Sequence, residues 1–145
     1  MDNKVIADIR QFNRYYTDVL GLLNKSVLDT GYSLTEARVI IEIGLMEQCI
    51  ANNLVDFLNI DRSYMSRIIR KLKKDGLIIK EPSASNVRTN LIRLSPEGLV
   101  LFNEINKKSD EQLVNLFQGL SRKQINEIHT SMLAIKKNLD SLERK

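Results

Sequence analysis

The sequence predicts a mainly α-helical protein with one small β-hairpin, in which a winged helix-turn-helix is flanked by long N- and C-terminal helices. The 145 residues include only two prolines and six glycines, and the segments between them repeat apolar residues every three or four positions. Near the middle of the chain, a helix-turn-helix pattern is followed at once by two short runs typical of β-strands. We treat residues 1–145 as a single domain, with a winged-helix lobe at about 33–95.

The segment 54–77, LVDFLNIDRSYMSRIIRKLKKDGL, carries the helix-turn-helix pattern. Asn59 lies where the turn needs a residue that tolerates positive φ, and Asp61 is a good N-cap for the second helix. Asp75 and Gly76 end that helix. An apolar stripe at helical spacing joins the two helices, and its members are Leu54, Val55, Leu58, Ile60, Met65, Ile68, Ile69 and Leu72.

The opposite face of the second helix is polar and basic, with Arg62, Ser63, Tyr64, Ser66, Arg67, Arg70 and Lys71. A helix about 10–12 Å across fits a DNA major groove about 12 Å wide. Residues 61–93 hold nine basic and three acidic residues, a net of +6, so the rest of the +4 chain sums to −2. A charged surface that only contacts solvent would give the same count. Because the basic centre coincides with the helix-turn-helix, we interpret it as a phosphate-binding surface.

The segments before this pattern are predicted from apolar periodicity and capping signals. One amphipathic helix is expected from Asn3 to about Asp29, and a second begins after Ser33 or Thr35 and runs to about Met46. Ser33 and Glu36 have the spacing of a capping box. A short link at 49–53, with room for one β-bridge, leads into a third helix at about 52–58.

The segments after the helix-turn-helix predict a hairpin and two further helices. Residues 77–81 and 89–94 are expected to be strands joined by the polar loop 82–88, a projecting wing. The residues expected on their inner face are Leu77, Ile79, Ile92 and Leu94. Ser95 and Pro96 begin a helix that continues towards Phe117, and Ser121 with Gln124 offers a second capping box.

The last helix carries a narrow apolar seam of coiled-coil character, formed by Ile125, Ile128, Met132, Ile135, Leu139 and Leu142. The terminal segments, about 1–30 and 96–145, hold more apolar surface than a small winged-helix core can cover. We therefore expect a homodimer built from both chain ends, although a monomer with these helices folded back is the alternative.

Other classes of protein find little support in the sequence. No run of about 18 apolar residues predicts a membrane span, and the N-terminus lacks the apolar core of a signal peptide. The lone Cys49 suits a reducing cytoplasm, and we expect an inert, partly buried thiol. The only histidine, His129, lies in the seam helix, so we predict no enzyme, no metal site and no cofactor.

The order of these elements resembles the MarR family of bacterial winged-helix regulators. The resemblance is carried by Leu34-Thr35-Glu36-Ala37-Arg38-Val39, Leu58-Asn59-Ile60-Asp61, Ser63-Tyr64-Met65-Ser66-Arg67 and Leu94-Ser95-Pro96-Glu97-Gly98. The segments FNRYYTDVLGLL and YSLTEARV look similar to the regulator half of MarR proteins fused to a GNAT acetyltransferase. The chain stops where that domain would begin, so no acetyltransferase activity is expected. The family's wing motif Asp-x-Arg is here Asn86-Val87-Arg88, which keeps the arginine and lacks the carboxylate.

The resemblance implies a cytoplasmic homodimeric repressor that binds a pseudo-palindromic DNA operator. It implies base-edge contacts for Ser63, Tyr64 and Arg67, and a minor-groove contact for Arg88. Phosphate contacts are expected from Ser66, Arg70 and Lys73, and Arg62 and Lys71 are also expected to contact DNA.

Relatives often bind a small amphipathic or phenolic effector. Tyr15, Tyr16, Tyr32 and Arg38 lie on segments that could line such a crevice, although aromatic residues at helical spacing commonly belong to the core. The rival interpretation of the whole chain is a winged-helix protein-interaction module that has lost DNA binding and meets an acidic partner.

Overall fold

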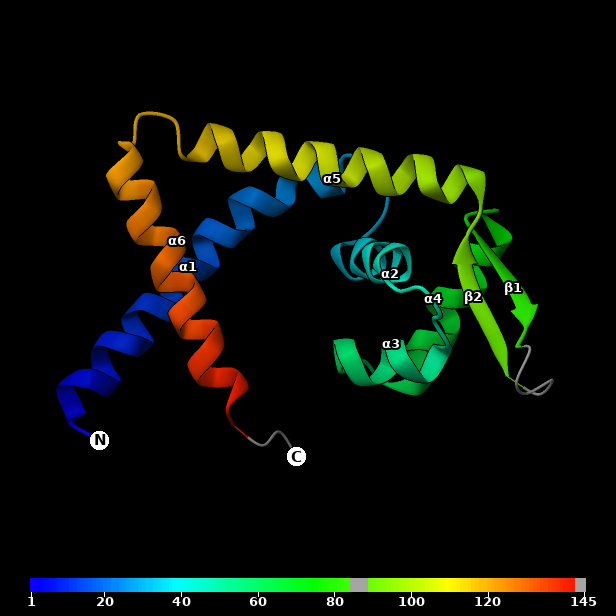
Figure 1. The fold of residues 1–145 in the computed structure, drawn as a ribbon, viewed down its shortest axis with the longest axis horizontal. Coiled ribbons are helices and arrows are strands. Elements are labelled where there is room, and N and C mark those ends of the chain that lie inside the picture. The colour runs from blue at the N-terminus through cyan, green and yellow to red at the C-terminus, as the bar shows by residue number, and fades with distance from the viewer. Residues whose placement is uncertain (84–88, 143–145) are drawn as a thin grey trace. The chain divides into compact units, whose positions relative to one another are not determined.

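The computed structural model describes residues 1–83 and 89–142, and it has the predicted mainly α-helical architecture with one β-hairpin. In chain order the elements are α1 (Asn3–Leu28), α2 (Leu34–Leu45), α3 (Ala51–Leu58), α4 (Arg62–Lys74), β1 (Ile78–Pro82), β2 (Asn90–Leu94), α5 (Pro96–Leu116) and α6 (Arg122–Asp140) (Figure 1). The chain divides into two compact units, residues 1–110 and residues 111–145.

The core of residues 1–110 is centred on α2, which packs against α1, α3 and β2. The predicted apolar stripe of the helix-turn-helix is confirmed, because six of its members are buried and Val55 and Ile60 pack against them. The largest fully buried side chains are Val39, Ile40, Cys49, Leu54, Met65 and Leu72. Since α4 also packs on β1, the helix-turn-helix and the hairpin share this core.

Local hydrogen bonds set the helix ends where the capping signals predict them. The Ser33 hydroxyl accepts from Glu36 N at 3.1 Å, and Glu36 Oε1 accepts from Ser33 N at 2.9 Å, so the capping box of α2 is present. Asn59 adopts φ 51° between α3 and α4. The Asp61 carboxylate accepts two backbone N–H groups from the first turn of α4 and thereby fixes its start.

The hairpin differs from the prediction in the residues that face the core. Leu77 N donates to Leu72 O at 2.9 Å, so Leu77 takes part in the C-terminal cap of α4, and the strand begins one residue later. The antiparallel register pairs Ile78 with Leu94, Ile79 with Arg93 and Lys80 with Ile92. The prediction that Ile79 shares the inner face with Ile92 is therefore wrong, and Ile78 takes that place.

The start of α5 is fixed closely against the end of α4. Ser95 caps the helix as predicted, with Gly98 N donating to Ser95 Oγ at 3.0 Å, and Ser95 N donates to Leu77 O at 2.9 Å. A Cβ added at Gly98 would lie 1.9 Å from Leu77 O, so this position has room only for glycine. The residues of α5 that face the core are Gly98, Leu101 and Ile105.

Residues 111–145 contain the end of α5, a turn at Gly119 and α6. Gly119 has φ 94°, and Ser121 with Gln124 forms the predicted capping box. No described residue of α6 is buried, and most of its seam is exposed, with Ile135 and Leu139 each 49% exposed. Among the described helices, none combines the length and apolar character that a bilayer crossing requires.

Candidate nucleic-acid interface

The helix α4 has two sharply different sides. Its four buried residues are Met65, Ile68, Ile69 and Leu72. Its other residues are exposed, and besides Lys71 and Lys74 they form what we call the basic face, made of Arg62, Ser63, Tyr64, Ser66, Arg67, Arg70 and Lys73. The helical period separates the two sets, so burying the apolar stripe leaves the basic face open to a partner.

Two residues of the basic face contact each other. The Arg67 guanidinium lies over the Tyr64 ring, with 5.5 Å between Cζ and the ring centroid. Residues three apart are neighbours on a helix surface, and this distance is within the range of a cation–π contact. The two side chains therefore form a unit at the N-terminal half of α4.

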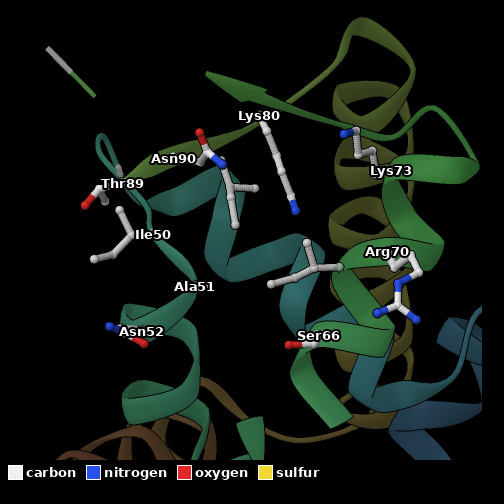
Figure 2. A pocket seen from close by; sticks show the side chains of 11 residues that line it. Ile50, Ala51, Asn52, Ser66, Arg70, Lys73, Lys80, Thr89 and Asn90 are labelled. Atoms are coloured by element: carbon white, nitrogen blue, oxygen red, sulfur yellow. The ribbon is translucent and has the colours of Figure 1, made fainter. Parts of the chain in front are cut away.

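A hollow of about 550 Å³ lies beside the C-terminal half of the basic face. It is bounded by α4, the N-terminus of α3 and the hairpin, and its lining residues are Ile50, Ala51, Asn52, Ser66, Ile69, Arg70, Lys73, Lys80, Thr89, Asn90 and Ile92. Figure 2 shows the Lys80 side chain reaching from β1 into the space between the strand and α4. Among the residues that the structure describes, the lining contains three cations and no carboxylate, so the hollow favours an anionic group such as a phosphate.

Lys80 was not among the residues predicted from the sequence to contact DNA. Its pairing with Ile92 places it on the face of β1 that meets the hollow. The sequence Ile78-Ile79-Lys80 would have predicted this position for Lys80 if Ile78, and not Ile79, had been placed on the inner face of the strand. The one-residue error that placed Ile79 on the inner face therefore also placed Lys80 on the wrong face of the strand.

Lys71, which was also predicted to bind DNA, contacts residues near the start of α2. Lys71 Nζ lies 2.8 Å from Glu36 Oε2 and 5.2 Å from the centroid of the Tyr32 ring. The hydrogen bond with Glu36 raises the pKa of Lys71 above its usual value. The structure thus joins Lys71 to the start of α2.

The four residues predicted to line an effector crevice occupy different environments. Tyr15 is 63% exposed, Arg38 is exposed, and Tyr16 stacks on Phe12 with 5.5 Å between ring centroids. The Tyr32 hydroxyl donates to Asp75 Oδ2 at 3.0 Å. None of the four lines the hollow beside α4, and the effector site stays a prediction.

The remaining candidates add no reactive centre. Cys49 is buried, and burial, aided by the charge of Glu42, raises the pKa of its thiol to about 11. Its carbonyl accepts from Ile92 N at 2.7 Å, which forms the predicted β-bridge. In the part of the chain that the structure describes, no cluster of His, Cys, Asp or Glu has the make-up of a metal site. The wing residues Asn86, Val87 and Arg88 lie outside the described residues.

Comparison with known proteins finds a family match for part of the chain and solved structures with a similar fold. Residues 30–88 match the family model of the MarR family. Comparison of the sequence with curated proteins gives no match. The fold is similar to that of Streptococcus pneumoniae FabT in complex with DNA, with a TM-score of 0.79 and 17% identity over 93% of this chain and 99% of that chain.

Two further solved structures share the fold over nearly the whole chain. The apo form of E. coli MarR gives a TM-score of 0.75 with 15% identity, covering 87% of this chain and 94% of that chain. A MarR family transcriptional regulator from Listeria monocytogenes complexed with 26mer DNA gives 0.70 with 22% identity, covering 94% and 97%. At these identities the likeness establishes the fold, which is the one predicted from the sequence.

Proposed function

We propose that this chain is a transcriptional regulator of the MarR family and that it binds double-stranded DNA through the basic face of α4. The observation that carries the proposal is an exposed, basic helix face backed by a fully buried apolar stripe on the same helix. Similar regulators from S. pneumoniae and L. monocytogenes were solved with DNA. MarR-family proteins are transcription regulators and not enzymes, which agrees with the expectation that the chain has no enzymatic activity.

The roles within the interface follow from side-chain chemistry. Ser63, Tyr64 and Arg67 project from the N-terminal half of α4, where a recognition helix meets base edges, and an arginine binds guanine O6 and N7 bidentately. Phosphate contacts are assigned to Arg62, Ser66, Arg70, Lys73 and the newly found Lys80, with Arg88 expected at the wing. Such contacts fix register without reading sequence.

A dimer is the second part of the proposal. Each subunit would bring one α4 to one half-site of a pseudo-palindromic operator, since two-fold protein symmetry matches two-fold DNA symmetry. The exposed seam of α6 and the exposed apolar residues of α1, including Ile9 and Phe12, supply unpaired apolar surface for the partner subunit. Repression in the cytoplasm and release by a small phenolic or amphipathic effector, through a shift in half-site spacing, complete the proposal.

A protein-interaction module that meets an acidic partner is the alternative. It would use the same basic face, so charge alone does not separate the two functions. Salt dependence and sequence preference do, because DNA binding through Z phosphates gives a slope of log K against log salt of roughly −0.9Z.

The test is to select genomic DNA fragments with the purified protein and to titrate an enriched fragment and a shuffled one over a range of salt. We expect an enriched fragment, preferential binding to it and a steep salt slope. Lys73→Ala should weaken both fragments equally and flatten the slope by about 1. Lys107→Ala, which removes the same charge from an exposed position of α5, is the matched control. Failure to enrich any fragment would overturn the proposal.

A further inference from the structure

Four polar side chains outside the basic face join the start of α2 to the last turn of α4. We call them the α2–α4 clasp, and they are Tyr32, Glu36, Lys71 and Asp75. Lys71 Nζ lies 2.8 Å from Glu36 Oε2, and the Tyr32 hydroxyl donates to Asp75 Oδ2 at 3.0 Å. The Lys71 ammonium also lies over the Tyr32 ring, so the two contacts are interlocked.

Glu36 is held more firmly than a carboxylate in an ordinary surface ion pair. Its Oε1 accepts from Ser33 N in the capping box while its Oε2 meets Lys71, so both oxygens are used. The Glu36 side chain is only 12% exposed. Burial acts to raise the pKa of Glu36, but the hydrogen bonds from Lys71 and Ser33 outweigh it, and the pKa lies below its usual value. The ionised carboxylate therefore has one defined position.

Tyr32 adds a second directional contact to the same turn. It is half-buried against the core, and Asp75 is the C-cap residue of α4. Burial, together with the hydrogen bond to Asp75, raises the pKa of Tyr32 above 10.0, so the phenol stays protonated and donates. Because Lys71 and Asp75 are four residues apart, both contacts grip one turn of the helix.

Apolar packing and this clasp do different things for α4. The buried stripe holds the helix on the core through hydrophobic contacts, which are non-directional. Hydrogen bonds and ion pairs depend on angle and distance. Reading base edges requires a recognition element to be held within about 0.5 Å and 10–20° of its productive geometry.

We propose that Tyr32 and Glu36 are positioning residues for DNA recognition, which set the orientation of α4 through Asp75 and Lys71 without touching DNA. The inference rests on the proposed DNA-binding function. It also assigns Lys71 a role within the protein, in place of the DNA contact predicted from the sequence.

The test compares Glu36→Gln, Tyr32→Phe and Lys71→Gln with the wild-type protein. Glu36→Gln keeps an oxygen for the capping box and removes only the ion pair, and Tyr32→Phe removes only the hydroxyl. Glu47→Gln, an exposed carboxylate with the same charge change, is the matched control. Each protein is titrated with the enriched fragment and the shuffled fragment over a range of salt, at a temperature where all are folded.

We expect the ratio of specific to non-specific affinity to fall roughly three- to tenfold in all three clasp variants, the range of residues that act without contacting the ligand. The salt slope should stay unchanged, and the double variant Glu36→Gln/Lys71→Gln should be no worse than the worse single one. A purely structural role would lower the melting temperature and leave the ratio intact.

Two results would overturn the inference alone. One is an unchanged specificity ratio in the variants alongside clear sequence preference in the wild-type protein. The other is a Lys71→Gln variant that weakens both fragments equally and flattens the salt slope, which would identify Lys71 as a phosphate contact. A wild-type protein without sequence preference would instead overturn the proposed function itself.

Discussion

The Arg67 guanidinium lies over the Tyr64 ring, 5.5 Å from its centroid, on the exposed side of α4. A long arginine side chain loses about 0.5–1.5 kcal/mol of conformational freedom when binding immobilises it. Stacking on a neighbouring ring restricts the guanidinium before DNA arrives, and it leaves the edge of the fork free for bidentate hydrogen bonds. Tyr64 therefore supports Arg67 in addition to any contact of its own.

The first prediction separates the ring of Tyr64 from its hydroxyl. Arg67→Ala should weaken specific binding by roughly 1–3 kcal/mol and relax preference at one base position in each half-site. Tyr64→Ala should reproduce part of that loss, about 0.5–1 kcal/mol, because it removes the stacking surface. Tyr64→Phe keeps the ring and should bind almost as the wild-type protein does. Equal losses in Tyr64→Phe and Tyr64→Ala, measured by operator titration, would show that the hydroxyl is what matters.

The second prediction concerns the close approach of α5 to the end of α4. Gly98→Ala would place a Cβ 1.9 Å from Leu77 O, and a backbone oxygen cannot move aside without shifting the strand that follows it. Overpacking of this kind costs roughly 1–3 kcal/mol or more. Gly21→Ala is the control, because nothing lies within 4 Å of its added Cβ and alanine favours the helix. Thermal unfolding should show a lower melting temperature for Gly98→Ala and none of this loss for Gly21→Ala.

Most of the fold could be predicted because its signals are local. The caps at Ser33, Asp61 and Ser121 and the left-handed Asn59 each depend on a few neighbouring residues, and all are confirmed. The faces of the hairpin strands were harder to predict, because side chains alternate with a period of two and a shift of one residue exchanges the inner and outer sets.

The contacts within the site were harder to predict than its elements. The partners of Lys71 lie 35 or more residues away in sequence, at Glu36 and Tyr32. Helical periodicity placed Lys71 among the polar residues of α4 but carried no information on which neighbour would take its charge. The position of Lys80 beside the hollow depends on the pairing of β1 with β2, which is also a non-local relationship.

The third prediction tests the dimer. Ile128→Glu with Ile135→Glu would bring two charges into the proposed α6 interface, at a cost of several kcal/mol if they are buried without partners. Asn126→Glu with Thr130→Glu adds the same charge to the opposite side of the helix and serves as the control. Light scattering at micromolar concentration should give a dimer for the wild-type and control proteins and a monomer for the seam variant. A monomeric wild-type protein would contradict this assembly.

The fourth prediction is that Cys49 is unreactive in the folded protein. With a pKa of about 11, only about one thiol in a thousand is ionised at pH 8, and the side chain is buried. Labelling with a thiol reagent at pH 8 should be slow in buffer and fast in denaturant. Rapid labelling of the folded protein would mean that Cys49 becomes accessible, and a redox role would then merit a test.

The last prediction concerns how the contribution of Glu36 to stability depends on pH. The pKa of Glu36 in the folded protein lies below its usual value of 4.5, because the hydrogen bonds from Lys71 and Ser33 outweigh the effect of burial. A lowered pKa means that the stabilising contribution is fully present above the unfolded value and is lost as pH falls through the folded one. The free energy of unfolding, measured in urea at fixed protein concentration, should therefore favour the wild-type protein over Glu36→Gln from pH 7 to about 5. That difference should shrink on further acidification, whereas Glu47→Gln should show no comparable loss. A difference that persists undiminished to pH 3 would contradict an ionic contact, and no difference at pH 7 would mean that the Glu36–Lys71 pair contributes nothing to stability.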